Sequence, residues 1–165
     1  MNKKLVVYVD MDDCLCDYNG AYTTYKSKHP STPFPQSISG FFLSLKPLPG
    51  AIESIHWLAS IEYLDVYILS APSILNPLCY TEKRLWVEQN LGFEFVNRLI
   101  LSPHKHLNVG DYLIDNNTSG KGQELFQGKL VHFGSDTFPN WASVRAYFEQ
   151  VIAKAKNRRP LHARK

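Results

Sequence analysis

The sequence contains only three cysteines, Cys14, Cys16 and Cys79, among its 165 residues. Three thiols cannot all pair with one another, and no cysteines and histidines with zinc-site spacing accompany them. Disulfide bonds persist mainly in oxidising compartments, so this usage favours a reducing one. We therefore expect a cytoplasmic protein without structural zinc.

Long apolar runs are also absent. The start, Met1 to Lys4 followed by the apolar run Leu5–Val9, resembles a signal peptide only briefly, because Asp10 ends the run. A membrane-spanning helix needs about 20 mostly apolar residues. We therefore expect no membrane segment and no secretion signal.

The sequence lacks a strong excess of one charge, since its formal net charge is only +3 with neutral histidines. The basic excess gathers near the end, at Lys154, Lys156, Arg158, Arg159, Arg164 and Lys165. Such an end can touch nucleic acid, but terminal charge clusters are usually solvated. We interpret residues 156–165 as a flexible basic tail and expect no nucleic-acid polymer as a partner. A homodimer is compatible with the sequence, which does not fix the oligomeric state.

The sequence does contain an alternation of apolar strands and sided helices. Apolar runs predict strands at residues 5–9, 65–69, 99–101, 112–114 and 130–133, and apolar stripes predict helices at about 50–61, 81–90 and 141–154. The first run has no polar alternation, which is typical of a strand buried on both faces of a parallel sheet. We predict an α/β fold: one domain over residues 1–155, with an open, mostly parallel sheet and helices wound on both sides.

The apolar pattern weakens between residues 18 and 46. Pro30, Pro33 and Pro35 stand there among serines and threonines, before an aromatic pair at Phe41 and Phe42. A helix begins soon after this segment, where Pro49 and Gly50 precede an apolar stripe. We interpret residues 18–46 as an insertion into the domain rather than as part of its core.

Polar residues follow several of the predicted strands. Asp10 and Asp12 come after the first strand, Ser70 after the second and Asp115 after the fourth, and Lys105 lies in the loop before the fourth. Ligands of such sheets bind beyond the carboxyl ends of the strands, so these side chains should face one crevice. Clustered carboxylates repel one another, and a bound divalent cation relieves that repulsion. Carboxylate oxygens favour magnesium, which also binds phosphate readily.

This set of residues suits the transfer of a phosphoryl group. Once a metal screens the phosphate, Asp10 can attack phosphorus and form an aspartyl-phosphate. Asp12, if the turn after the strand curls it toward the leaving oxygen, is placed as general acid and later as base for water. Ser70 would donate a hydrogen bond to a phosphoryl oxygen, and Lys105 would offset charge in the transition state.

These residues also resemble the four motifs of the haloacid dehalogenase phosphatases, whose core is a Rossmann-like sheet. Asp10-Met11-Asp12 is similar to the first motif, Ser70 to the second, Lys105 to the third and Asp115 to the fourth. Further stretches resemble the 5'(3')-deoxyribonucleotidase group of that superfamily. They are Pro47-Leu48-Pro49-Gly50-Ala51, Val66-Tyr67-Ile68-Leu69-Ser70, Glu82-Lys83-Arg84-Leu85-Trp86-Val87-Glu88 and Asp111-Tyr112-Leu113-Ile114-Asp115.

The resemblance implies a magnesium-dependent phosphomonoesterase that acts on deoxyribonucleotides. It makes residues 18–46 a small cap over the site, with Tyr18 near the substrate and Phe41 and Phe42 as candidates for stacking against a base. It assigns magnesium to Asp10, Asp12, Asp115 and Asn116. Asn116 departs from the family, which commonly has a second acid there, and offers a neutral carbonyl instead.

Several residues have alternative interpretations. Lys83 and Arg84 are a rival phosphate-binding pair, but cations on a helix surface are usually solvated, so Lys105 is the stronger candidate. His104 and His106 lack a partner set for metal, and Gly120-Lys121-Gly122 lacks the spacing of a phosphate-binding loop and is interpreted as a turn. Cys14 and Cys16 are interpreted as half-buried packing residues and Trp86 and Trp141 as core aromatics.

Three other functions stay open. The substrate could be another small phosphate ester, or the chain could bind nucleotides without turnover because Asn116 weakens the metal site. A phosphorylation-responsive receiver module also combines strand-end acids, a hydroxyl and a lysine. Receivers carry their phosphate-accepting aspartate on a strand between the acidic pair and the hydroxyl, and no aspartate ends a strand between Asp12 and Ser70.

Overall fold

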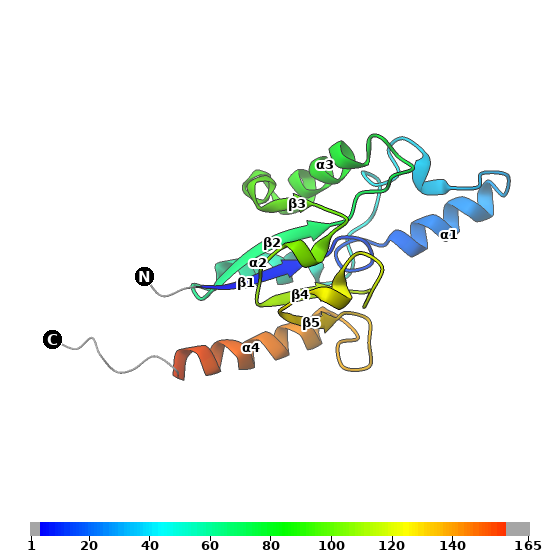
Figure 1. Cartoon of the computed structure of the whole chain (residues 1–165). Helices are drawn as coiled ribbons and strands as arrows, with labels where there is room; N and C mark the ends of the chain where they lie inside the picture. The colour runs from blue at the N-terminus through cyan, green and yellow to red at the C-terminus, as the bar shows by residue number, and fades with distance from the viewer. Residues whose placement is uncertain (1–3, 158–165) are drawn as a thin grey trace.

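A computed structural model describes residues 4–157 and contains one five-stranded sheet with the strand order β3-β2-β1-β4-β5 (Figure 1). The strands are β1 (Leu5–Val9), β2 (Leu64–Ser70), β3 (Leu99–Leu101), β4 (Tyr112–Asp115) and β5 (Lys129–His132). The α-helices are α1 (Tyr18–Lys28), α2 (Ala51–Ser60), α3 (Cys79–Leu91) and α4 (Trp141–Asn157). Short 3-10 helices are η1 (Pro35–Ser37), η2 (Phe93–Arg98), η3 (Lys105–Leu107) and η4 (Gln123–Leu125).

Every pairing in the sheet is parallel, which confirms the predicted α/β fold class. β1 lies at the centre and pairs with β2 on one side and with β4 on the other. The carboxyl ends of all five strands therefore lie at one edge of the sheet, where α1 projects (Figure 1). Parallel pairing thus brings residues far apart in the sequence to the same edge.

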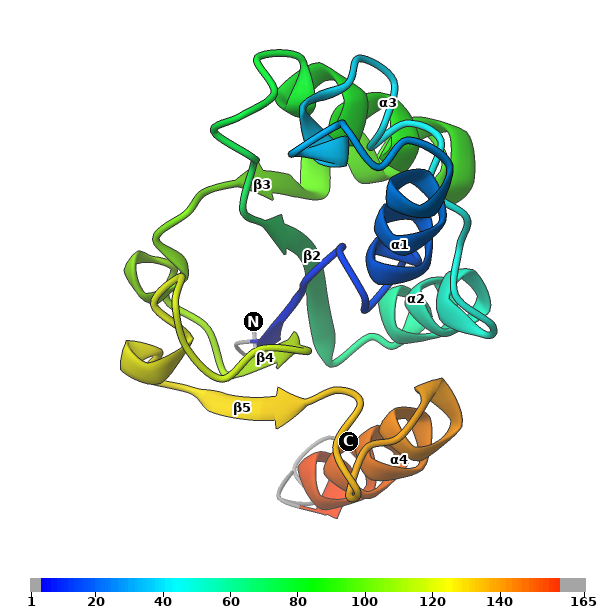
Figure 2. The same cartoon turned by 90° about the vertical axis from the view of Figure 1, so that its right-hand side faces the viewer.

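The two faces of the sheet are covered differently. Val7 and Val9 belong to the large hydrophobic cluster on the side of the α-helices, whereas Tyr8 joins a small cluster with Leu69 and Leu113. In Figure 2 the four α-helices lie to one side of the strands and the loops that carry η3 and η4 lie to the other. The expectation of α-helices on both faces was therefore wrong, because β3–β4 and β4–β5 are joined by loops with single 3-10 turns.

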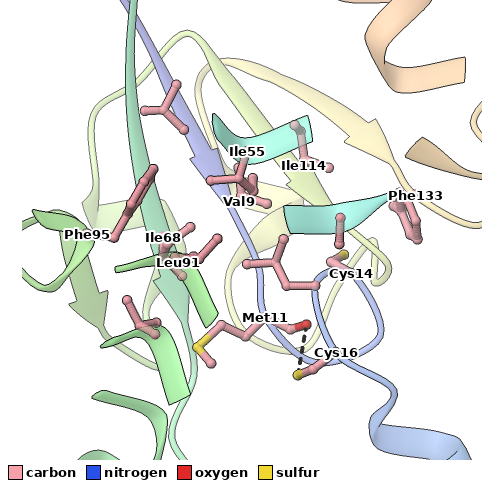
Figure 3. Close-up of a cluster of buried hydrophobic side chains, with 14 of the residues drawn as sticks. Val9, Met11, Cys14, Cys16, Ile55, Ile68, Leu91, Phe95, Ile114 and Phe133 are labelled. Carbon is pink, nitrogen blue, oxygen red and sulfur yellow. Dashed lines mark hydrogen bonds between the residues drawn. The ribbon is translucent and has the colours of Figure 1, made fainter. Parts of the chain in front are cut away.

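The insertion contributes more to the core than its sequence suggested. Phe41, Phe42 and Leu45 are buried and belong to the main cluster of apolar side chains, part of which Figure 3 shows around Met11, Ile55 and Ile68. The interpretation of residues 18–46 as lying outside the core was therefore wrong for its last part. Aromatic rings bury a large apolar area, and these two rings do so although the residues around them are polar.

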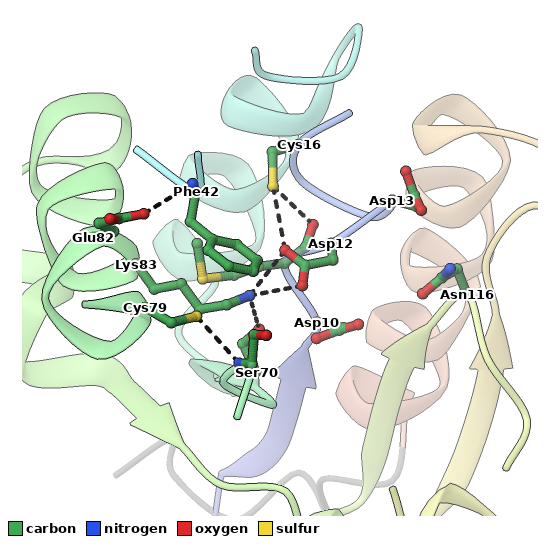
Figure 4. Close-up of polar contacts among 12 residues, drawn as sticks. Asp10, Asp12, Asp13, Cys16, Phe42, Ser70, Cys79, Glu82, Lys83 and Asn116 are labelled. Carbon is green, nitrogen blue, oxygen red and sulfur yellow. Dashed lines mark hydrogen bonds and ion pairs between the residues drawn. The ribbon is translucent and has the colours of Figure 1, made fainter. Parts of the chain in front are cut away.

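Two side chains of α3, those of Glu82 and Trp86, hold the end of the insertion against this helix. The buried carboxylate of Glu82 accepts hydrogen bonds from the backbone N–H groups of Gly40, at 2.7 Å, and Phe42, at 3.0 Å (Figure 4). The indole Nε1 of Trp86, one turn further along α3, donates to the carbonyl of Leu45 at 2.7 Å. The segment that follows η1 is thereby fixed in position relative to α3.

The first part of the insertion is a helix that the sequence pattern did not predict. None of the residues of α1 is fully buried, so the helix lacks the apolar stripe by which helices are recognised. Its beginning is stabilised by Asp17, whose carboxylate accepts a hydrogen bond from the Gly20 N–H at 2.9 Å. The signal for this helix was therefore its N-terminal cap and not its periodicity.

The five predicted strands and the three predicted helices are confirmed with small shifts in boundary. Trp86 and Trp141 are buried, and the Trp141 Nε1 donates to the carbonyl of Cys14 at 2.8 Å. Cys14 and Cys16 are fully buried free thiols, although the sequence suggested that they are half-buried.

The C-terminal helix is longer than the sequence predicted. α4 extends to Asn157, so the first two residues of the predicted basic tail are helical, and residues 158–165 lie outside the described part. None of the helices within residues 4–157 has both the length and the apolar character that a membrane span requires.

Candidate active site

The chain turns sharply immediately after β1. The backbone N–H of Asp10 still donates to the carbonyl of Ile114 on β4, at 2.9 Å, so Asp10 stands at the last paired position of the central strand. Beyond it, the backbone N–H groups of Cys14, Leu15 and Cys16 all donate to the carbonyl of Met11. Asp13 lies in this turn at φ 56°, a left-handed conformation that Asp tolerates better than most residues. The turn points Asp10 and Asp12 in different directions.

Lys105 connects Asp10 with Asp115. Its ammonium Nζ lies 2.9 Å from Oδ1 of Asp10 and donates a short hydrogen bond to Oδ2 of Asp115. All three side chains are buried, with exposed fractions of 1% for Lys105, 7% for Asp10 and 0% for Asp115. Burial opposes the charge of Lys105, but Asp10 and Asp115 outweigh it and raise the pKa of its ammonium group. The predicted residues of the first, third and fourth motifs therefore meet in one ionic cluster.

The carboxylate of Asp115 is fully engaged by protein donors. Oδ1 accepts a hydrogen bond from the backbone N–H of Asn117 at 2.8 Å, and Oδ2 accepts from Lys105 and from Nε2 of Gln123 at 3.2 Å. Burial and then the charge of Asp10 raise the pKa of Asp115, while Lys105 opposes the rise. These contacts make Asp115 a residue that positions Lys105.

A second lysine connects Asp12 with Ser70. The Nζ of Lys83, on α3, lies 2.8 Å from both carboxylate oxygens of Asp12 and donates to Oγ of Ser70 at 2.9 Å (Figure 4). Ser70 and Lys83 are fully buried, whereas 26% of the Asp12 side chain is exposed. Because the ammonium group is the donor in its contact with Ser70, the hydroxyl hydrogen of Ser70 can be donated to another acceptor.

The interpretation of Lys83 as a solvated surface cation was wrong. Lys83 faces inward from α3, and burial of the ammonium is outweighed by Asp12 and its neighbours, which raise the pKa of Lys83. Arg84 behaves as expected, since it is 41% exposed and pairs with Glu88 one turn along the helix. The neighbouring buried positions Trp86 and Val87 place Lys83 on the buried side of the helix, which is the signal that the sequence offered.

The electrostatics of Asp12 differ from those of an exposed carboxylate. Burial raises the pKa of its carboxyl group, the charge of Asp10 adds to the rise, and the ammonium of Lys83 opposes it. A carboxyl with a raised pKa holds its proton more readily than a free one. A raised pKa is one of the properties that a general acid requires.

The contacts divide the four side chains that the sequence assigned to magnesium. Both oxygens of Asp12 and of Asp115 are paired with protein donors. Asp10 shares one oxygen, Oδ1, with Lys105, and its side chain and that of Asn116 lie near the ends of β1 and β4 (Figure 4). Oδ1 of Asn116 accepts a hydrogen bond from the exposed Asn117 side chain at 2.9 Å. Across residues 4–157, no group of three or more His, Cys, Asp or Glu side chains is arranged to hold a metal ion. The oxygen donors fit a hydrated magnesium ion held by one or two side chains.

The predicted substrate-binding residues form an aromatic group beside Asp12. The rings of Tyr18 and Phe42 stack with centroids 6.1 Å apart, and Phe41 packs edge-on against both. Asp12, Tyr18 and Phe42 line a pocket of about 250 Å³, together with Gln36, Lys121 and residues 71–75. Phe41 is buried and is not among the residues that line this pocket. Burial and the charge of Asp12 raise the pKa of Tyr18 to about 12, so its hydroxyl keeps its proton near neutral pH.

Comparisons of the sequence with known proteins identify its family. Residues 34–156 match the family model described as "5' nucleotidase, deoxy (Pyrimidine), cytosolic type C protein". A protein of Vibrio phage KVP40 named "Putative 5'(3')-deoxyribonucleotidase" is 40% identical over 152 residues, which are 87% of this chain and 84% of the phage protein. The human 5'(3')-deoxyribonucleotidase of cytosolic type is 41% identical over 85 residues, 52% of this chain and 42% of that protein.

Solved structures support the fold. A haloacid dehalogenase-like family hydrolase from Xanthomonas campestris aligns with a TM-score of 0.64 and 11% identity, over 96% of this chain and all of its own. A "putative HAD-hydrolase" from Bacillus subtilis, solved with bound magnesium, aligns with a TM-score of 0.51 and 13% identity, over 84% and 90% of the two chains. At these identities the likeness concerns the arrangement of the backbone.

Because Lys83 is buried and pairs with Asp12, whereas its neighbour Arg84 is exposed, we expect replacement of Lys83 to destabilise the protein more than replacement of Arg84. Lys83→Met leaves the Asp12 carboxylate without its cation and should lower the free energy of unfolding by about 2 kcal/mol. That is less than the loss of about 3–5 kcal/mol for fully buried pairs, because Asp12 is partly exposed. Arg84→Met, the matched control, should cost less than about 1 kcal/mol. Urea unfolding of both variants measures the difference, and equal losses would contradict the buried pairing.

Proposed function

The chain belongs to the 5'(3')-deoxyribonucleotidase family of phosphoric monoester hydrolases, and on this basis we propose that it is a magnesium-dependent phosphomonoesterase that hydrolyses (deoxy)nucleoside monophosphates through an aspartyl-phosphate on Asp10. The observation that carries the proposal is the pair of ionic clusters at one sheet edge, Lys105 with Asp10 and Lys83 with Asp12. They hold two neighbouring carboxylates apart and give each a different environment. Two such carboxylates can take the roles of nucleophile and acid.

In the first step, Asp10 acts as the nucleophile. An oxygen of its carboxylate forms a bond to phosphorus while the bond from phosphorus to the ester oxygen breaks. Lys105 orients Asp10, because its ammonium lies 2.9 Å from Oδ1 of that carboxylate. Asp12 gives its proton to the departing ester oxygen, so the nucleoside leaves as a neutral alcohol.

In the second step, Asp12 acts as a base. It takes a proton from a water molecule, whose oxygen then attacks phosphorus and releases the carboxylate of Asp10. Ser70 donates a hydrogen bond to a phosphoryl oxygen, and Lys83 and Lys105 supply positive charge beside the oxygens that become more negative. Asp10 and Asn116 would hold a magnesium ion, which would supply further charge neutralisation for the phosphate.

The cellular setting is part of the proposal. The free, buried thiols of Cys14, Cys16 and Cys79 support a cytoplasmic location, since none of the three forms a disulfide bond. The small pocket beside Asp12 supports a small-molecule phosphate ester as the substrate. A second candidate, nucleotide binding with little turnover, is favoured by Asn116, which brings no charge to the metal site.

Replacing the proposed nucleophile tests the reaction. Asp10→Asn removes the charged oxygen and should lower kcat/KM for a 2'-deoxynucleoside monophosphate by about 10⁴-fold or more in the presence of magnesium. Glu149→Gln makes the same exchange of carboxylate for amide at an exposed position of α4 and should leave the rate unchanged. Released phosphate is the readout, with a set of sugar phosphates beside the nucleotides. Undiminished turnover by Asp10→Asn would refute the mechanism, and preference for a sugar phosphate would refute the substrate class.

Replacing Asn116 tests whether the protein is an active phosphomonoesterase or binds nucleotides with little turnover. Asn116→Asp adds a negative charge beside Asp10 and should tighten magnesium binding about 10-fold, because the ligand charge increases. Asn117→Asp is the control, since it adds the same charge one residue further on at an exposed position. Calorimetric titration with magnesium measures both affinities. Equal affinities of the two variants would exclude Asn116 from the metal site, and phosphate release by Asn116→Asp alone would favour the binding function.

A further inference from the structure

One residue of the pocket beside Asp12 has no role in the chemistry described above. Gln36 belongs to η1, in the insertion, and lines the pocket together with Asp12, Tyr18, Phe42 and Lys121. The sequence motifs did not single it out. It lies on the part of the pocket wall that the insertion contributes.

The backbone holds Gln36 in a fixed place. The preceding Pro35 is buried and fixes the first backbone angle of the 3-10 turn. The N–H of Ser37 donates to the carbonyl of Phe34 at 2.9 Å, and the N–H of Ile38 donates to the carbonyl of Pro35 at 3.1 Å. The turn therefore presents the side chain of Gln36 with little backbone freedom.

The amide oxygen of Gln36 is buried without a hydrogen-bond partner among the described residues. Buried polar atoms are nearly always hydrogen-bonded, because an unpaired one loses its contact with water and gains nothing in return. Gln36 itself lines the pocket, so a turn of its side chain would bring this unpaired acceptor to a donor that arrives with the substrate. An amide oxygen has two lone pairs and no proton, so this donor must be an N–H or O–H group.

The walls of the pocket indicate which donor arrives. Tyr18 and Phe42 contribute stacked rings, and a flat aromatic ligand packs against such surfaces. The leaving oxygen of the ester meets Asp12, so the sugar and then the base extend from Asp12 into the rest of the pocket. A base packed along the aromatic wall presents the N–H groups of its edge in the plane of the ring, where a side-chain amide can meet them.

From these observations we propose that Gln36 is a specificity-determining residue, whose amide oxygen accepts a hydrogen bond from an N–H group on the edge of the substrate's nucleobase. The proposal rests on the proposed phosphomonoesterase function and names the part of the substrate that Gln36 recognises. A site built to pair with an N–H group discriminates against substrates that lack it, because the buried acceptor then stays unpaired. Gln36 thereby distinguishes nucleotides from phosphate esters without a base.

The test compares two substrates that differ only in the base, thymidine 5'-monophosphate and 2-deoxyribose 5-phosphate. Gln36→Met keeps the length of the side chain and removes its polar atoms. It should lower kcat/KM about 10-fold for the nucleotide, mainly through KM, and change it less than about twofold for the sugar phosphate. Gln36→Glu keeps acceptor oxygens and should preserve the ratio of the two kcat/KM values. Gln89→Met, at an exposed position of α3, is the control and should change neither.

Other results would overturn the proposal. Equal losses on both substrates in Gln36→Met would assign Gln36 a structural role, and an unchanged rate for the nucleotide would exclude the contact. If Gln36→Glu lowers the ratio of the two kcat/KM values as much as Gln36→Met does, the amide of Gln36 donates a hydrogen bond to the base instead of accepting one.

A binding measurement tests the role of Gln36 independently of the proposed catalytic function. The affinity for thymidine 5'-monophosphate, measured by calorimetry in the Asp10→Asn variant with and without Gln36→Met, should fall about 10-fold when Gln36 is replaced. Absence of phosphate release from every substrate would refute the proposed function, while an equal affinity of the two variants would refute the role of Gln36.

Discussion

The pairing of two buried lysines with three carboxylates is the interaction on which the site depends. The parallel sheet brings Asp10 and Asp115 to the same edge, and the turn after β1 adds Asp12. Carboxylates buried so close together repel one another and lose their hydration, so each needs a cation. Lys105 reaches two of them from η3 and Lys83 reaches the third from α3. The positions of η3 and α3 relative to the sheet therefore determine which cation each carboxylate contacts.

The insertion is coupled to the same clusters through α3. Lys83 holds Asp12, its neighbour Glu82 holds the backbone of Gly40 and Phe42, and Lys83 also lies 4.9 Å from the centroid of the Phe42 ring. Successive residues of one helix thus contact the catalytic turn and the aromatic wall of the pocket. Because of these contacts, a shift of the insertion would also move Asp12. The shape of the substrate pocket is therefore linked to the position of the proposed acid.

The sequence predicted those features that follow from strand order and missed those that follow from packing. Asp10, Ser70 and Asp115 could be grouped because the carboxyl ends of parallel strands share an edge. Lys83 was missed although Trp86 and Val87 lie on the same side of its helix, because its burial depends on the carboxylate that faces it in the folded chain. α1 was missed because it has no buried residue. The unpaired oxygen of Gln36 becomes visible only in three dimensions.

In the proposed reaction the carboxylate of Asp10, held by Lys105, attacks phosphorus. This step can be tested by quenching the magnesium-loaded protein with acid during turnover of a deoxynucleoside monophosphate and analysing its peptides by mass spectrometry. We expect one phosphoryl group on the peptide that contains Asp10, bound as an acyl phosphate that neutral hydroxylamine releases. Turnover without a phosphorylated aspartate, or a phosphoryl group on a different residue, would contradict it.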